Sequence, residues 1–273
     1  MKPIQILRDI TLLSEMKGET IVVETDHINE IETITEAVET NNHLFCVKLR
    51  VNQNITSIIW KEAWEKIPMV VYPLGLGAVR DLIEILPVLK KINVKFFLDA
   101  AQEQHYEAVQ ILSSLGIYCG MVISETTDWE KLTDLMYYAL CAKAPHAPIE
   151  PFQYIYDLYE RNRLVDFGRV FFSGERFNFY TSKSTKDFHE GTQSSQTKPW
   201  QRFFYEATPC ATCAGWRICM GKYANLEDKT KCQNFMVELL QLIESLKFKV
   251  QCSRFKTTPL SPAGGGDYSP LNS

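Results

Sequence analysis

Four cysteines gathered in one short stretch are the residues best suited to chemistry. They are Cys210, Cys213, Cys219 and Cys232, separated by two, five and twelve residues. A Cys-x2-Cys pair can bring two thiolates onto one metal ion or cluster, and two further thiolates complete a tetrahedron of sulfur ligands. Soft sulfur donors suit iron–sulfur clusters and zinc better than hard cations. We therefore predict a four-cysteine cofactor-binding and metal site. Loose thiols or two disulfides are the alternative interpretation.

The composition is that of an ordinary globular chain of 273 residues, 45% hydrophobic and 23% charged. A net charge of -4, with no basic run interleaved with aromatics, argues against nucleic-acid binding. The N-terminus lacks the apolar core of a signal peptide, and no apolar run approaches the roughly 18 residues of a membrane span. We therefore expect a cytoplasmic protein with no membrane partner. In a reducing compartment, clustered cysteines are better interpreted as ligands than as disulfides.

The first half alternates apolar strand-like runs with segments of helical periodicity. Strands are predicted at 21–24, 44–49, 69–72, 94–98, 117–123 and about 164–171. Helices are predicted from about 27, at 55–67, around 82–89, and at about 101–115, 127–142 and 150–162. This alternation predicts βα units and a parallel sheet. Right-handed crossovers would wind six such units into either an open barrel or a doubly wound sheet.

Several side chains of this half have predicted positions. In the 55–67 helix we expect four side chains to face the core: Ile59, Trp60, Ala63 and Ile67. Three further cysteines lie among apolar neighbours and are predicted to pack in the core, namely Cys46, Cys119 and Cys141.

Polar residues near the ends of predicted strands are candidates for catalysis at the mouth of a barrel. They are Asp26, His27, Glu103 and His105, but they form no recognisable acid–base set. Asp26 is better explained as the N-cap of the following helix. The Gly75-Leu-Gly77 segment precedes a helix, so it predicts a turn, with a small-anion site as the alternative.

The second half breaks the βα alternation. A β-hairpin is predicted over 171–180, and a polar loop over 181–198. The 235–246 segment predicts an amphipathic helix that packs back on the first half. The final residues, 257–273, are too poor in apolar side chains to order themselves.

The cysteine spacing resembles the SPASM domain of radical S-adenosylmethionine peptide-modifying enzymes, which follows a partial barrel. That family carries C-x2-C-x5-C-x3-C and a later lone cysteine. Cys210, Cys213 and Cys219 match the first three positions, and Cys232 matches the lone cysteine. The resemblance implies that these four residues bind the second of the family's two auxiliary [4Fe–4S] clusters. Zn²⁺ is the alternative cofactor.

Two departures from the family pattern change what the resemblance implies. Tyr223 occupies the fourth position of the motif, and no cysteine lies between Cys141 and Cys210, so the first auxiliary cluster is expected to be lost. The family's C-x3-C-x2-C triplet, which leaves one iron open for S-adenosylmethionine, occurs nowhere in the chain. The segment 24–27 joins the first predicted strand directly to its helix. The segment 50–54 replaces the glycine-rich cofactor-binding segment. No S-adenosylmethionine is therefore expected, which favours a non-catalytic protein over an enzyme.

The chain is thus similar to the pseudo-radical-SAM proteins of Bacteroidales peptide-modification systems. The resemblance implies an α/β fold with a partial (β/α)6 radical-SAM-like barrel over 1–165. A SPASM-like iron–sulfur domain with a hairpin and a C-terminal helix would span 166–256, followed by a disordered tail over 257–273. The implied function is natural product biosynthesis, as a partner in the maturation of a ribosomally synthesised peptide that binds the precursor or a radical-SAM maturase. The alternatives are an α/β binding protein with a structural four-cysteine zinc site, and an enzyme with unrecognised chemistry at the barrel mouth.

Overall fold

The computed structural model describes residues 4–15, 18, 20–41, 43–124, 126–160, 180–183, 209–215 and 229–256. The predicted strand at 164–171, nearly all of the predicted hairpin, Cys219 and the tail lie outside these residues.

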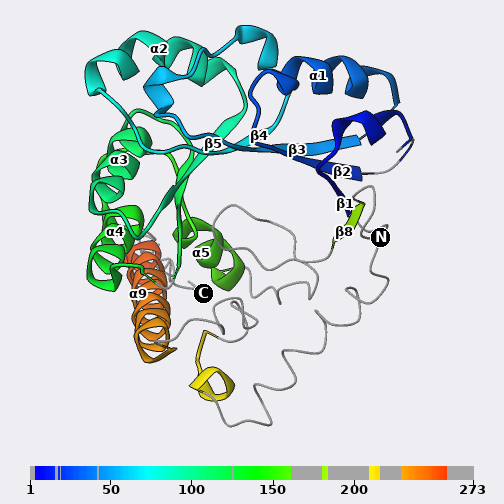
Figure 1. Cartoon of the computed structure of the whole chain (residues 1–273). Helices are drawn as coiled ribbons and strands as arrows, with labels where there is room; N and C mark the ends of the chain where they lie inside the picture. Colours follow the sequence, from blue (N-terminus) through cyan, green and yellow to red (C-terminus); the bar gives the residue numbers. More distant parts are fainter. Residues whose placement is uncertain are drawn as a thin grey trace, which may run out of the picture.

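A parallel sheet of eight strands dominates the described part of the chain (Figure 1). Apolar and β-branched runs form its central strands, as expected for strands that have helices packed against one face of the sheet. The strands are β1 (Ile4–Leu7), β2 (Thr20–Thr25), β3 (His43–Arg50), β4 (Met69–Tyr72), β5 (Val94–Asp99), β6 (Cys119–Val122), β7 (Ile149–Glu150) and β8 (Tyr180–Lys183). Every recorded pairing between neighbouring strands is parallel.

The strand order is β7-β6-β5-β4-β3-β2-β1-β8, so the strands from β1 to β7 are neighbours in chain order. A doubly wound sheet reverses direction at a switch point, and this order has no reversal between β1 and β7. Right-handed crossovers between consecutive strands place their helices on one face. Accordingly, α1 (Glu30–Asn41), α2 (Val79–Lys91), α3 (Glu103–Ser114) and α4 (Trp129–Cys141) line the outer side of a curved sheet (Figure 1). The predicted α/β class and parallel sheet are confirmed, and the sheet is not doubly wound.

The two faces of the sheet differ in chemistry because successive side chains of a strand point to opposite faces. The helix-covered face forms the main core, with fully buried side chains such as Val47, Leu49, Phe96 and Leu98. The other face carries a smaller apolar cluster of Val22, Cys46, Val70 and Phe97.

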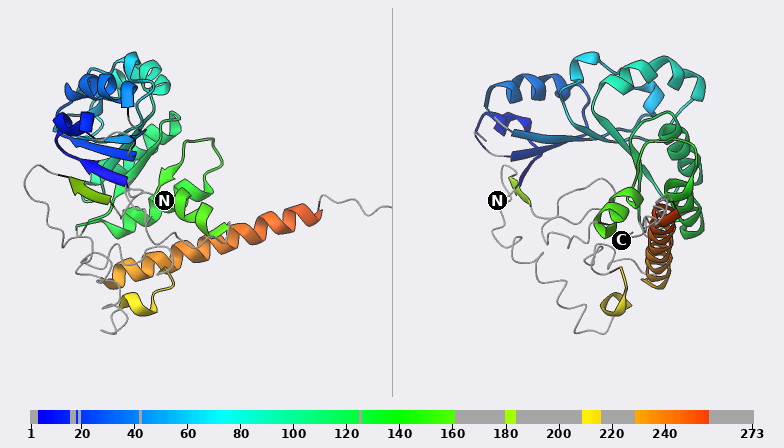
Figure 2. Two further views of the ribbon diagram at one scale, coloured as in Figure 1. Left: turned by 90° about the vertical axis from the view of Figure 1, so that its right-hand side faces the viewer. Right: turned by 180° about the vertical axis from the view of Figure 1, so that it is seen from behind.

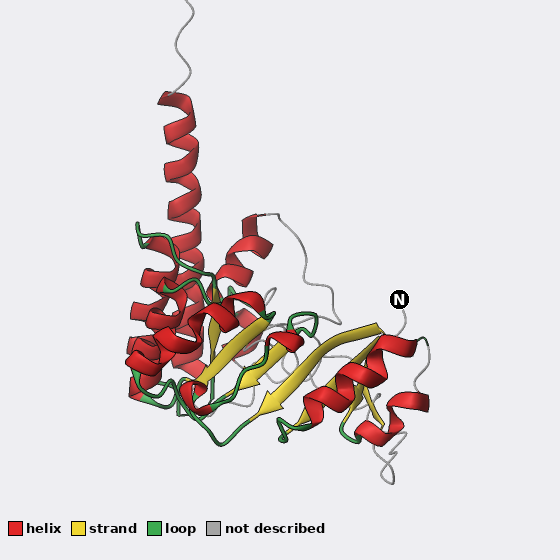
Figure 3. Ribbon diagram, turned by 90° about the horizontal axis from the view of Figure 1, so that it is seen from above, coloured by secondary structure: helices red, strands yellow, loops and turns green. Residues whose placement is uncertain are grey.

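Helices α5 (Phe152–Glu160) and α9 (Lys229–Lys256) complete the described fold. The predicted amphipathic helix 235–246 is confirmed as part of α9, which packs against α4 and α5. The Phe235 ring lies 5.6 Å from the Trp129 ring and 6.2 Å from the Phe152 ring, centroid to centroid. Contacts continue to Lys247, whose Nζ donates to the Tyr159 carbonyl oxygen at 2.9 Å, and beyond them α9 extends away from the rest of the described chain (Figures 2 and 3). No helix in the described ranges combines the length and apolar character needed to cross a bilayer.

The helix predicted over 55–67 is wrong. Two 3-10 turns, η2 (Ile55–Ser57) and η3 (Glu62–Trp64), stand in its place. Ile59 is 80% exposed and Ala63 is also exposed, whereas both were expected to face the core. The chain turns so that residues at irregular spacing reach the core, and a regular helix cannot bury them together. The buried side chains of this stretch are Ile55, Ile58, Trp60, Trp64 and Ile67.

Three strands have no counterpart among the predictions. Strand β1 precedes the first predicted strand, which is β2, and β7 has only two residues at the start of the predicted 150–162 helix. Strand β8 is polar and includes the first residues of the predicted 181–198 loop, yet it pairs with β1. Its backbone groups join the sheet without an apolar pattern that sequence analysis could detect.

The predicted burial of the three isolated cysteines is confirmed for Cys46 and Cys119 and is wrong for Cys141. The last turn of α4 places Cys141 in an exposed position, because this helix buries a different face. That face consists of Leu132, Leu135, Met136 and Ala139.

Candidate functional site

The first two candidate ligands lie on one tight turn. Cys210 belongs to the 3-10 turn η4 (Pro209–Thr212), and Cys213 follows it directly. The backbone N–H of Cys213 donates to the carbonyl oxygen of Cys210, with an N···O distance of 3.3 Å. This compact backbone is the arrangement that lets a Cys-x2-Cys pair share one metal ion or cluster.

The cysteine turn packs against the beginning of α9, the helix that carries Cys232 (Figure 2). Gly215, two residues after Cys213, is buried at this contact. A Cβ atom built there would lie 2.5 Å from Met236 Cε and 2.8 Å from Met236 Cβ. Met236 is one helical turn beyond Cys232, and both Cys213 and Cys232 contact the main hydrophobic core. Glycine therefore permits the close approach of two segments that each carry candidate ligands.

The donor chemistry of this region fits a thiolate-bound cluster, but the described residues do not assemble a ligand set. Among them, no group of three or more histidine, cysteine, aspartate or glutamate residues is placed to hold a metal ion. Cys219 lies within 216–228, outside the described residues. The structure thus brings the elements of Cys210, Cys213 and Cys232 into contact without forming a complete site.

The candidates for barrel-mouth catalysis do not share one cavity. Asp26 and His27 are exposed between β2 and α1. Asp26 is not the N-cap of α1, because the helix begins only at Glu30. The hydroxyl of Thr25 instead accepts a hydrogen bond from the His27 N–H at 2.9 Å and donates one to the Glu30 carboxylate. Glu103 forms an exposed ion pair on the surface of α3 with a lysine of α4.

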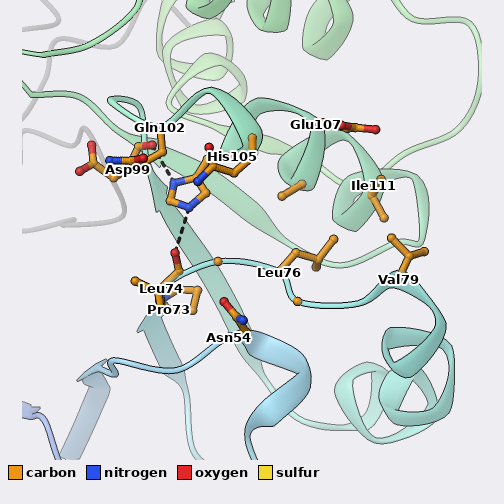
Figure 4. Close-up of a pocket in the computed structure, with 14 residues that line it drawn as sticks. Asn54, Pro73, Leu74, Leu76, Val79, Asp99, Gln102, His105, Glu107 and Ile111 are labelled. Carbon is orange, nitrogen blue, oxygen red and sulfur yellow. Dashed lines mark hydrogen bonds between the residues drawn. The ribbon is translucent and has the colours of Figure 1, made fainter.

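A cavity of about 780 Å³ lies at the carboxyl ends of β4 and β5 (Figure 4). It is bounded by Asn54, by the loop 73–78 that follows β4, by Asp99 at the end of β5, and by the first half of α3. The carboxyl ends of parallel strands are the usual position of ligand sites in α/β proteins. Its lining residues come from three separate stretches of the chain, so no local sequence pattern could have predicted it.

His105 is the buried polar residue of this cavity, with 3% of its surface exposed. Its Nδ1 lies 2.9 Å from the Asp99 carbonyl oxygen, and its Nε2 lies 3.0 Å from the Leu74 carbonyl oxygen (Figure 4). Carbonyl oxygens only accept, so a neutral ring donates to one of them and a protonated ring donates to both. His105 therefore ties the end of β5 to the loop after β4, and its nitrogens point at backbone rather than into the cavity.

The loop 73–78 is held by a second set of backbone contacts. The N–H of Ile55 donates to the Gly75 carbonyl oxygen at 2.9 Å, and the N–H of Leu74 donates to the Gln53 carbonyl oxygen at 2.9 Å. Gly77 has φ +84°, and a Cβ atom there would lie 2.0 Å from Thr56 Oγ1. The segment is an irregular loop in which Gly75 forms an isolated parallel bridge with Asn54, and the second glycine is required by both backbone conformation and space.

The inner face of the sheet carries a charged group that sequence analysis missed. Lys48 is 5% exposed, and its Nζ lies 3.3 Å from Glu24 Oε1. The other oxygen of Glu24 accepts from Arg8 Nε at 3.0 Å. An ionised lysine is rarely buried without a carboxylate partner, because its desolvation is expensive. The sequence signal was a lysine between the apolar Val47 and Leu49 of β3.

Comparisons with protein-family models, with curated proteins and with solved structures found no match. The functional conclusions therefore depend on the residues and contacts of this chain.

Proposed function

We propose that this protein is a non-catalytic, pseudo-radical-SAM partner in the maturation of a ribosomally synthesised peptide. In this proposal Cys210, Cys213, Cys219 and Cys232 bind one auxiliary [4Fe–4S] cluster. The protein would act in the cytoplasm and bind the precursor peptide, a radical-SAM maturase, or both. The observation that carries the proposal is the contact between the Cys210–Cys213 turn and the start of the helix that carries Cys232.

The sheet supports the proposed partial barrel. Strands in chain order, all parallel and covered by helices on one side, are typical of a (β/α) barrel that has not closed. Strand β8 adds to the free edge of β1 and lies far along the chain, after the barrel segment. The proposed radical-SAM-like barrel and SPASM-like domain are consistent with this order of elements.

The loops after the first strands support the non-catalytic part of the proposal. In the enzymes that the chain resembles, three cysteines follow the first strand of the barrel. Strand β1 precedes the strand that sequence analysis took as the first, so two loops must be considered. Neither the segment 8–19 after β1 nor the segment 26–29 after β2 contains a cysteine. A cluster with one open iron therefore has no ligands at either position.

Anaerobic purification and reconstitution with iron and sulfide test the cofactor. We expect a visible charge-transfer absorbance and stoichiometric iron, as thiolate-bound iron–sulfur clusters give. Changing each of the four proposed ligands to serine should lower both signals. Cys141→Ser is the matched control, since this cysteine is exposed on α4 and should leave both unchanged. A colourless protein that holds one zinc ion would contradict the iron–sulfur cluster and indicate a structural zinc site.

Two further assays test the role. A tagged protein expressed with its genomic neighbours should co-purify with a precursor peptide or a radical-SAM maturase. Cleavage of S-adenosylmethionine by the isolated, reduced protein would contradict a non-catalytic role. Failure to bind either partner, in the presence of an intact cluster, would contradict the peptide-maturation role alone.

A further inference from the structure

The cavity beside His105 has an apolar wall that is open to solvent. This wall includes Leu76, Val79 and Ile111, and Leu74 borders the cavity at its other end, beside Pro73 (Figure 4). Leu74 is 57% exposed and Val79 is 48% exposed, which is high for aliphatic side chains that share one cavity. Large apolar side chains that remain exposed around a concave surface are typical of a place where another molecule binds. The wall therefore fits an aliphatic group.

The cavity is also lined by side-chain amides. They belong to Asn54, Gln102 and Gln104, which come from the segment after β3 and from the start of α3. An amide side chain both donates and accepts hydrogen bonds. A peptide bond offers the same pair of groups, so these three residues suit an extended peptide backbone better than a hydrocarbon chain.

The charge of the lining excludes one class of ligand. Asp99 and Glu107 line the cavity, whereas no lysine or arginine does so among the described residues. One oxygen of Asp99 accepts the N–H of Ala101 at 2.9 Å, which fixes the carboxylate at the end of β5. Two carboxylates without a cation repel an anion and attract a cation. A phosphate or carboxylate ligand, including the small anion considered for Gly75–Gly77, is therefore disfavoured.

We propose that this cavity binds a peptide segment that presents an aliphatic side chain together with two lysines. The aliphatic group lies against the Leu76 and Val79 wall, and the amides pair with the peptide backbone. Glu107 and Asp99 lie on opposite sides of His105 (Figure 4), so one lysine ammonium lies near Glu107 and the other near Asp99. The volume of about 780 Å³ is sufficient for a short segment of this kind. The inference rests on the proposed function, because it names the chemistry by which the precursor peptide would be recognised.

Binding to synthetic peptides tests the proposal. The probes are three fluorescent, capped hexapeptides that share one leucine and differ in two positions, which hold lysine, glutamine or glutamate. We expect the lysine peptide to bind most tightly and the glutamate peptide to bind at least about three- to ten-fold more weakly, as two exposed ion pairs allow. Added salt should reduce this preference. Equal binding of the three peptides, or no binding of the lysine peptide, would overturn the proposal.

Matched variants locate the binding to the cavity. Glu107→Gln with Asp99→Asn should weaken the lysine peptide about three- to ten-fold and leave the glutamine peptide unchanged. Glu84→Gln is the control, since Glu84 is an exposed glutamate of the neighbouring helix α2 and does not line the cavity. Gln104→Trp should block all three peptides by filling the cavity from an exposed position, with circular dichroism confirming the fold. Unchanged binding in either cavity variant would place the peptide elsewhere and overturn the proposal.

The same samples separate this inference from the proposed function. Iron content and co-purification of partners report on the cysteine site and on the pathway. Peptide affinity reports on the cavity. Intact iron binding and partner capture combined with absent peptide selectivity would overturn only the assignment of the cavity.

Discussion

Replacement of Gly77 by alanine should reveal how tightly the loop that borders the cavity is held. Two effects add at this position. Its φ of +84° is left-handed, which costs a non-glycine residue roughly 1–2 kcal/mol. The new methyl group would also lie 2.0 Å from Thr56 Oγ1 and 3.2 Å from Thr56 Cβ. Overpacking of this kind costs about 1–3 kcal/mol, so we expect Gly77→Ala to lower the free energy of unfolding by about 2–5 kcal/mol.

Gly116 provides a matched control for the energetic cost of a left-handed φ at a non-glycine residue. Its φ is +83°, and the nearest atom to an added Cβ is Lys90 Cε at 4.0 Å. Gly116→Ala should therefore lower the free energy of unfolding by only the backbone share, about 1–2 kcal/mol. Urea unfolding followed by tryptophan fluorescence measures both variants, because the buried Trp60 donates to the Ile55 carbonyl oxygen beside this loop.

A double variant isolates the steric term. Thr56→Ala removes the hydroxyl that the new methyl group would meet, so it should recover at least about 1 kcal/mol in the Gly77→Ala background. Equal losses for Gly77→Ala and Gly116→Ala would refute the steric argument. Absence of coupling between positions 56 and 77 would refute it as well.

Three other predictions concern the core, the cavity and the thiols. Phe235→Ala should lower the free energy of unfolding by about 3–5 kcal/mol, because its buried ring packs between aromatic rings of α4 and α5. A loss below about 1 kcal/mol in urea unfolding would contradict this packing of α9. His105→Ala should cost about 1–3 kcal/mol in the same assay by removing the buried ring that lies between the Asp99 and Leu74 carbonyl oxygens, and a neutral effect would argue against its role in joining β5 to the loop 73–78. Burial raises the pKa of the Cys119 thiol, so near neutral pH it stays protonated and should react with iodoacetamide only after unfolding. The exposed Cys141 should react in the native state, and mass spectrometry of labelled peptides measures which cysteine reacts first.

The sequence predicted those elements whose apolar pattern is local. Strands β2 to β6 and helix α9 were found because their buried residues recur at the spacing of a strand or a helix. Strand β7 has too few residues for a pattern, and β8 is polar because its place in the sheet comes from backbone pairing with β1. In the 55–67 stretch the apolar residues are abundant, but tertiary packing selects Trp60 and Trp64 and leaves Ile59 in solvent.

The functional features divide in the same way. The cysteine spacing is local, so the sequence alone could suggest all four proposed ligands. The cavity depends on residues 54, 73–79 and 99–111, which only the parallel sheet brings together. The sequence could not predict the hydrogen bonding of His105 for the same reason. The partners of its ring are backbone carbonyl oxygens 6 and 31 residues away.

Iron and sulfide analysis of the anaerobically reconstituted protein tests the central claim most directly. We expect about four iron atoms and four sulfides per chain, as one [4Fe–4S] cluster requires, and their loss when Cys219 or Cys232 is changed to serine. A protein that binds zinc in place of iron, or that keeps its iron in those variants, would contradict it.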